Sequence, residues 1–254
     1  MSTASENEPA RDTTKRIGAE DFFATTHWTA VLTAGKRNTA ESDVALEELC
    51  RTYWYPLYAY VRRRGYSRED AEDLTQGFFE RLLRRNYLES VDSSKGKFRA
   101  FLLASLKHFL ANEWDRSQRQ KRGGGAPVLS LNWQEAETKY QCEPVDEVSP
   151  DKLFDRAWAI TLLEKVIERL RLETETEGKR ALFEQLRQVL TIDRDSIPYA
   201  QLSAESGTNV TLLRVWAHRL RRRYRDLLRF EISQTLMNPE QTEEEVKALF
   251  AAFA

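Results

Sequence analysis

Apolar side chains recur every three or four residues along most of this chain, and this spacing predicts amphipathic helices. The clearest case is the stretch 68–83, REDAEDLTQGFFERLL. Its apolar positions share one face of a helix: Ala71, Leu74, Phe78 and Leu82. Its polar positions gather on the other face: Glu69, Glu72, Asp73, Gln76 and Glu80. We expect this helix to pack its apolar stripe inward and to offer a row of acids to a basic partner.

The same spacing predicts further helices over 22–36, 42–64, 98–119, 153–172, 180–190, 198–207, 210–228 and 242–253. Pro56 should end or kink the helix 42–64, because proline lacks the amide that a helix interior uses. Gly65 is expected to close that helix, and Ser67 to cap the next one. No stretch alternates with a period of two, so the predicted fold class is all-α.

Composition divides the chain into two small helical domains, 21–122 and 153–230, joined by a flexible acidic linker, 123–152. The linker holds a triple glycine, three prolines and several carboxylates. The first twenty residues are polar and are expected to be a disordered tail, 1–20. A C-terminal amphipathic extension, 231–254, carries an apolar face made of Val246, Leu249, Phe250 and Phe253. This face would either cover a functional surface or complete the core of the second domain.

Composition also excludes several classes of protein. The net charge is −1, so the chain as a whole is not a basic nucleic-acid binder, although its charges are segregated locally. Two distant cysteines and the lack of a signal peptide or membrane span indicate a cytoplasmic, reduced protein without metal or cofactor. The three histidines are scattered, and no catalytic or phosphate-binding motif occurs, so we expect no enzymatic activity.

The stretch 198–228 has the features of a helix-turn-helix. Pro198 stands at the first position of one helix, Gly207 permits a sharp turn, and Asn209 caps the second helix. One side of the second helix is polar and basic: Thr211, Arg214, Val215, His218, Arg219 and Arg222. Such side chains can reach base edges in the major groove and hold phosphates. The alternative is a basic helix that packs on a neighbour or on an acidic partner.

The helix 98–119 ends among basic and aromatic side chains, including Trp114 and Arg116. Rings that stack on bases beside cations that follow phosphates suit a single DNA strand. The alternative assigns Trp114 to the core and the cations to the helix dipole.

Three motifs, in order, resemble bacterial RNA polymerase sigma factors of the extracytoplasmic-function (ECF) group. DAEDLTQGFFERLL at 70–83 is similar to the region 2.2 pattern DAEDLVQEVFLRLW. FRAFLLASLKHFLANEWDR at 98–116 is similar to regions 2.3–2.4, and the stretch 198–228 to region 4.2. The resemblance covers about 42–122 and 154–230. It implies a sigma factor with a region 2 domain and a region 4 domain.

The resemblance also implies partners and site residues. Docking on the β′ clamp helices of core RNA polymerase would use Glu72, Asp73, Gln76 and Glu80. Recognition of the −10 element as a non-template single strand would use Lys97, Arg99, Lys107, His108, Asn112, Arg116 and Arg119. Recognition of the duplex −35 element would use Asn209, Thr211, Arg214, Val215, His218, Arg219 and Arg222. The β flap of the polymerase and an anti-sigma factor are further partners to consider.

The sequence departs from the family pattern at several positions. Gly77 stands where a carboxylate is usual, His108 replaces Asn, and Trp216 replaces Arg. A phosphate that a kinase places on Thr75 would restore charge near Gly77, whereas the alternative is a half-buried β-branched residue.

Two other functions remain open at this stage. The chain could be a helix-turn-helix regulator that acts without polymerase, or a helical adaptor that uses only its acidic face. Promoter-dependent transcripts made with core polymerase would separate both from a sigma factor.

Overall fold

The computed structural model describes residues 40–83, 97–117, 132–143, 149–193, 196–236 and 238–253, and these ranges contain helices and no strand. The α-helices are α2 (Ala40–Arg63), α3 (Arg68–Leu83), α5 (Phe98–Ser117), α6 (Trp133–Gln141), α7 (Pro150–Thr176), α8 (Arg180–Leu186), α9 (Tyr199–Ser206), α10 (Val210–Ser233) and α11 (Thr242–Ala251). Two 3₁₀ turns are η2 (Arg187–Leu190) and η4 (Pro239–Gln241). The predicted all-α class is confirmed. The expected tail 1–20 and the expected helix over 22–36 lie outside the described residues.

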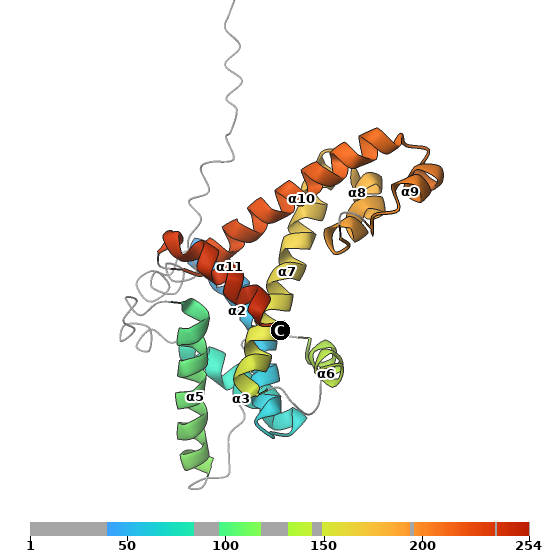
Figure 1. Cartoon of the computed structure of the whole chain (residues 1–254). Helices are drawn as coiled ribbons and strands as arrows, with labels where there is room; N and C mark the ends of the chain where they lie inside the picture. The colour runs from blue at the N-terminus through green and yellow to red at the C-terminus, as the bar shows by residue number, and fades with distance from the viewer. Residues whose placement is uncertain are drawn as a thin grey trace, which may run out of the picture.

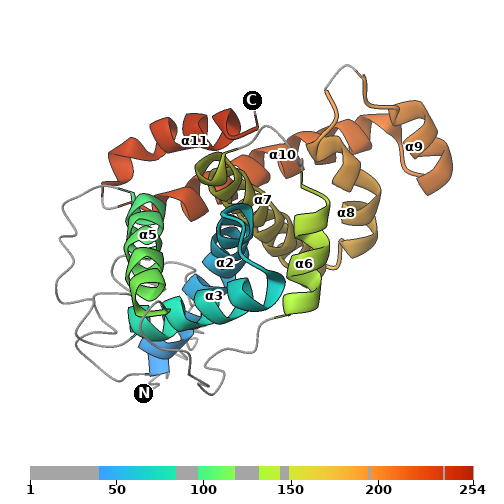
Figure 2. The ribbon, with the colours of Figure 1, turned by 90° about the horizontal axis from the view of Figure 1, so that it is seen from below.

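Two long helices, α7 and α10, connect the two ends of the molecule (Figure 1). At one end α2 packs along α7, with α3 and α6 against α2 and α5 against α3. At the other end α8, η2 and α9 pack on α7 and α10. Helix α11 turns back from the end of α10 and lies against both α10 and α7, as Figure 2 shows from below.

Short-range signals set several of the helix ends. Gly65 lies in the turn that follows α2. Its φ of +91° is a backbone conformation that residues with a side chain rarely adopt. The hydroxyl of Ser67 accepts a hydrogen bond from the amide of Asp70 at 3.1 Å and caps α3 as predicted. Ser149 does the same for α7, accepting from the amide of Lys152 at 3.3 Å.

Pro56 does not end α2, contrary to one of the two outcomes expected for it. The helix continues through Pro56 to Arg63. A proline inside a helix costs about 3 kcal/mol. Burial of both sides of this segment offsets the cost, because Tyr55, Leu57 and the residues that follow to position 61 are all buried.

The linker that the sequence predicted as flexible contains an ordered helix, so this part of the prediction is wrong. Helix α6 occupies 133–141, and α7 begins at Pro150, before the expected domain boundary. Trp133 packs edge-on against Trp54 of α2, with ring centroids 5.7 Å apart. A tryptophan in an acidic stretch supplies the apolar surface that fixes α6 to α2.

The two expected domains share one buried core. Trp158 and Leu162 of α7 are fully buried in the same cluster as Tyr53 of α2 and Leu227 of α10. Charged groups join the same helices, since the buried carboxylate of Glu231 on α10 pairs with cations of α7. Helix α7 is therefore part of both ends of the molecule.

Candidate functional site

The acidic face of α3 lies at the surface as the sequence predicted. Asp73 is exposed, while Glu72, Gln76 and Glu80 are half-buried. Arg68 donates a hydrogen bond from Nε to Glu72 at 2.8 Å, so this carboxylate already has a partner within α3. Asp73 is the most accessible carboxylate among the four side chains predicted to bind polymerase.

Gly77 belongs to the contact between α3 and α5. A Cβ at this position would lie 3.5 Å from Cζ of Phe109, at ordinary van der Waals distance. The carboxylate that the family usually carries here would begin beside α5. The absence of this carboxylate therefore removes less negative charge from the exposed acidic face than the sequence suggested.

Thr75 is deeper than the half-buried position expected for it. Its side chain is completely buried, and its hydroxyl makes no hydrogen bond within the described part of the chain. The residue therefore belongs to the packed side of α3. A kinase could reach this hydroxyl only after α3 had opened locally.

Helix α10 presents the predicted basic face. The following side chains are all exposed: Asn209, Thr211, Arg214, Val215, His218, Arg219 and Arg222. The opposite side of the helix is buried through Leu213, Ala217 and Leu220. The apolar spacing of α10 therefore orients its basic side chains toward solvent.

The turn between α9 and α10 has the conformation predicted for it. Gly207 adopts φ +66°, and the carboxamide of Asn209 accepts from the amide of Thr211 at 2.8 Å. The hydroxyl of Ser203 donates to the carbonyl of Thr208 at 2.7 Å and holds the turn against α9. Pro198 directly precedes α9 rather than occupying its first position. Trp216 is half-buried beneath the ammonium of Lys179, which lies 4.3 Å from the ring centroid.

The predicted strand-binding residues of α5 fall into two groups. His108 and Asn112 are exposed, whereas Lys97, Arg99 and Lys107 each form an ion pair with a carboxylate of another helix. The side chain of Arg116 and the whole of Arg119 lie outside the described residues.

A hollow of about 740 Å³ lies where α5 meets the end of α2. Its lining combines aromatic and charged side chains: Tyr60, Tyr66, Trp114, Arg64, Lys107 and Asp151. Trp114 is 60% exposed, so the sequence alternative that places it in the core is wrong. Trp114 is the exposed ring of this lining, whereas Tyr60 is buried and Tyr66 half-buried. An exposed ring near cations is an arrangement on which an unstacked base can stack.

The segment that holds most of α2 together with α3 and α5 is similar in sequence to a known protein family. Residues 49–120 match the family model for Sigma-70 region 2. This match supports the assignment of the chain as a sigma factor of the sigma-70 family, which takes part in promoter recognition together with RNA polymerase. No curated protein and no solved structure matched the chain.

Helix α6 binds region 2 through the carboxylate of Glu137, a residue that the sequence pattern did not single out. Glu137 receives two hydrogen bonds from Arg62, each 3.0 Å long, and a third from the hydroxyl of Tyr58. Burial alone would raise the pKa of Glu137, but the hydrogen bonds from Arg62 and Tyr58 outweigh it and lower the pKa below its usual value. The same burial raises the pKa of Tyr58. In the sequence, Glu137 lies between the apolar side chains of Ala136 and Tyr140, which is only a weak sign that its carboxylate is buried.

The C-terminal extension also reaches region 2, by a face that matches the predicted one only in part. Leu249 is buried and Val246 half-buried as expected, but Phe250 and Phe253 are exposed. The second buried side chain of α11 is Glu245, which pairs with cations at the start of α5. An acid within an amphipathic helix is expected on the solvent side, so the prediction included Val246 and Leu249 but missed Glu245.

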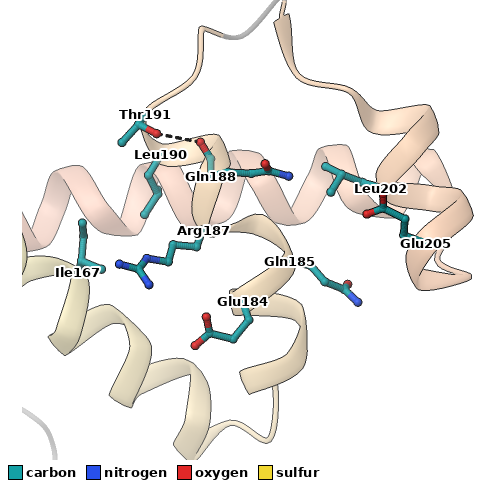
Figure 3. A pocket seen from close by; sticks show the side chains of 9 residues that line it. All are labelled: Ile167, Glu184, Gln185, Arg187, Gln188, Leu190, Thr191, Leu202 and Glu205. Atoms are coloured by element: carbon teal, nitrogen blue, oxygen red, sulfur yellow. Dashed lines mark hydrogen bonds between the residues drawn. The ribbon is translucent and has the colours of Figure 1, made fainter.

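A second hollow, of about 650 Å³, lies outside region 2 between α8, η2 and α9 (Figure 3). Leu190 and Leu202 line it together with the charged side chains Glu184, Arg187 and Glu205. The described residues contain no cluster of metal-binding side chains, and none of the described helices is long and apolar enough to cross a membrane.

Proposed function

We propose that the chain is a sigma factor of the ECF group. It binds core RNA polymerase through region 2 and directs initiation at promoters by recognising a −10 and a −35 element. The observation that carries this proposal is the region 2 match over 49–120, together with the helix pair α9 and α10, in which α10 has an exposed basic face. We propose no enzymatic role and a location in the cytoplasm.

Docking on the β′ clamp helices is assigned to the acidic face of α3. Asp73 carries the most accessible charge, and Gln76 and Glu80 follow it at helical spacing on the same side. An exposed carboxylate that meets a basic partner contributes to the rate and the specificity of docking.

Recognition of the −35 element is assigned to α9 and α10, as a helix-turn-helix in a region 4 domain over 153–230. Arg214, Val215 and His218 lie in the first half of α10, where a helix seated in the major groove meets base edges. Arg219 and Arg222 lie further along, where they would hold phosphates. Region 4 is also the part that would contact the β flap.

Recognition of the −10 strand is assigned to α5 and the hollow beside Trp114. His108 and Asn112 are exposed on α5, and the exposed ring of Trp114 lines the same hollow as the half-buried Tyr66. An unstacked base fits such a site because every base offers a flat face for stacking.

The proposal is tested by the affinity of the full-length protein for core polymerase. We expect Asp73→Arg to weaken binding at least tenfold, or about 1.4 kcal/mol. The matched control is Glu244→Arg, which makes the same charge reversal at an exposed position of α11. Binding to duplex DNA through α10 should be the same in both variants.

The outcomes also separate the alternatives. Equal affinity of the two variants for core polymerase would refute docking through α3. Duplex binding that core polymerase does not affect would favour a regulator, and polymerase binding without transcripts would favour an adaptor.

A further inference from the structure

The carboxylate of Glu245, on α11, is completely buried against the start of α5. One oxygen lies 2.6 Å from the ammonium of Lys97, and the other accepts a hydrogen bond from Nε of Arg99 at 2.5 Å. Burial alone would raise the pKa of Glu245, but the hydrogen bonds from Arg99 and Lys97 outweigh it and keep the pKa below its usual value. The amide of Phe98 also donates to the carbonyl of Thr235 at 3.2 Å. The segment that leads into α11 is therefore bound to α5 by its main chain as well as by charge.

Helix α7 supplies two more carboxylates to α5. Asp155 pairs with Arg99, and Asp151, one turn earlier on α7, pairs with Lys107. The guanidinium of Arg99 also lies over the ring of the buried Trp158, 4.8 Å from its centroid. Only 13% of the Arg99 side chain remains exposed, so these contacts leave little of it for another ligand.

Three acids from two helices thus meet two cations of α5 and Lys97, which directly precedes it. We call Asp151, Asp155 and Glu245 the acidic latch, and Lys97, Arg99 and Lys107 the α5 cations. We propose that in the free protein the acidic latch occupies the places that DNA phosphates take on α5, so that a strand binds there only after α7 and α11 have moved away. This inference rests on the proposed function in one respect, the assignment of strand binding to α5.

The pairs differ in how easily they open. The pair between Lys107 and Asp151 is about half exposed, with 46% and 52% of the two side chains accessible, and surface pairs of this kind contribute little to stability. Glu245 is fully buried, and a buried carboxylate separates from its partners only at a large cost unless water or another ion replaces them. DNA phosphates can replace the carboxylates on the α5 cations. Glu245 would then become hydrated as α11 detaches.

The test uses the full-length protein and a fluorescein-labelled single strand of oligo-dT, with binding followed by anisotropy at several salt concentrations. The latch variant combines Asp151→Asn, Asp155→Asn and Glu245→Gln. Its matched control combines Glu168→Gln, Glu243→Gln and Glu244→Gln, which remove the same charge from exposed positions of the same two helices.

We expect the latch variant to bind the strand at least tenfold more tightly than the control variant. Three cations released to phosphates should also steepen the slope of log affinity against log salt by about 2, at roughly 0.7 for each contact with a single strand. Equal affinity and equal slope in the two variants would overturn the proposal.

A double variant, Asp151→Asn with Asp155→Asn, protects the test against misfolding. Both side chains are partly exposed, at 52% and 39%, and Glu245 keeps its own contacts, so this variant should fold like the parent. It should bind the strand more tightly than Glu168→Gln alone, and its helical circular dichroism should equal that of the parent. Unchanged affinity in a folded double variant would also contradict the proposal.

A last variant separates this proposal from the assignment of α5. Lys97→Gln, Arg99→Gln and Lys107→Gln, added to the latch variant, should return the affinity to that of the parent. If the affinity stays high, the strand binds elsewhere and the role of α5 in the proposed function is wrong. If the same three changes weaken binding in the parent but the latch variant gains nothing, α5 keeps its role and the latch is refuted.

Discussion

Gly77 is the residue at which the sequence departs most clearly from the family pattern in the acidic helix. Its position beside Phe109 explains why a small residue is tolerated there, although the space does not require glycine. Glycine inside a helix costs about 1 kcal/mol relative to alanine, because it loses more backbone freedom on folding.

We therefore expect Gly77→Ala to raise the free energy of unfolding by about 0.5–1 kcal/mol, measured by urea denaturation. Gly65→Ala is the matched control, since φ is +91° there and the same methyl group should destabilise the protein by about 1–2 kcal/mol. A loss of stability in Gly77→Ala as large as that in Gly65→Ala would contradict the contact described between α3 and α5.

Glu137 is the residue that fixes α6 to region 2. We expect Glu137→Gln to lower the free energy of unfolding by about 2 kcal/mol, because charge-assisted hydrogen bonds from Arg62 and Tyr58 are lost. Glu135→Gln, at an exposed position of the same helix, should change it by less than about 0.5 kcal/mol.

The pH dependence of stability provides a second test of this carboxylate. The pKa of Glu137 is lower in the folded protein than its usual value of 4.5, so the unfolded chain binds the proton more readily. Its contribution is fully present above about pH 4.5 and is lost as the pH falls through the folded-state pKa. The difference in stability between parent and Glu137→Gln should therefore shrink on acidification. A difference that grows below pH 4.5 would refute the lowered pKa.

At the scale of elements, α10 has two parts with different expected roles. Its first half exposes Arg214 and His218 beside Val215, whereas Arg222 lies two turns further along. Base contacts depend on the DNA sequence and phosphate contacts do not.

We expect Arg214→Ala to weaken binding to a duplex selected by the parent protein by about 1–3 kcal/mol, and to affect unselected DNA much less. Arg222→Ala should weaken both duplexes alike and reduce the salt slope by about 1. The measurement is a salt titration of both duplexes by anisotropy. Equal losses on both duplexes for Arg214→Ala would show that this part of α10 reads no bases.

The ends of the elements were largely predictable, because the signals that set them are local. Gly65, Ser67 and Asn209 each act on their own turn or on the next few residues, and each lies where the sequence placed it. The bounds of α3 match the prediction for the same reason. Helix α6 was missed because its stability comes from α2, through Trp133 and Glu137, and not from its own polar sequence.

At the scale of the whole molecule, the sequence favoured two separate domains, and the structure joins them. The joining contacts are pairs between residues far apart in the chain, such as Arg99 of the first expected domain with Asp155 of the second. An acid on a helix gives no local sign that it will be buried against a cation of another helix. For this reason the exposed faces of α3 and α10 could be predicted, whereas the occupied cations of α5 could not.

The closed arrangement of α5, α7 and α11 and the activity proposed for the chain are compatible. In the proposed function region 2 docks on polymerase through α3, and no residue of α3 takes part in the ion pairs that cover the α5 cations. Polymerase can therefore bind the acidic face first, and contacts with DNA can then compete for the cations of α5.

The central claim, that this chain directs promoter-specific initiation, is tested most directly by transcription in vitro. Core RNA polymerase would transcribe genomic DNA with and without the protein, and the 5′ ends of the transcripts would be mapped. We predict new 5′ ends that depend on the protein, lie downstream of one shared pair of sequence elements, and disappear with Asp73→Arg. A set of 5′ ends that is the same with and without the protein would contradict the account.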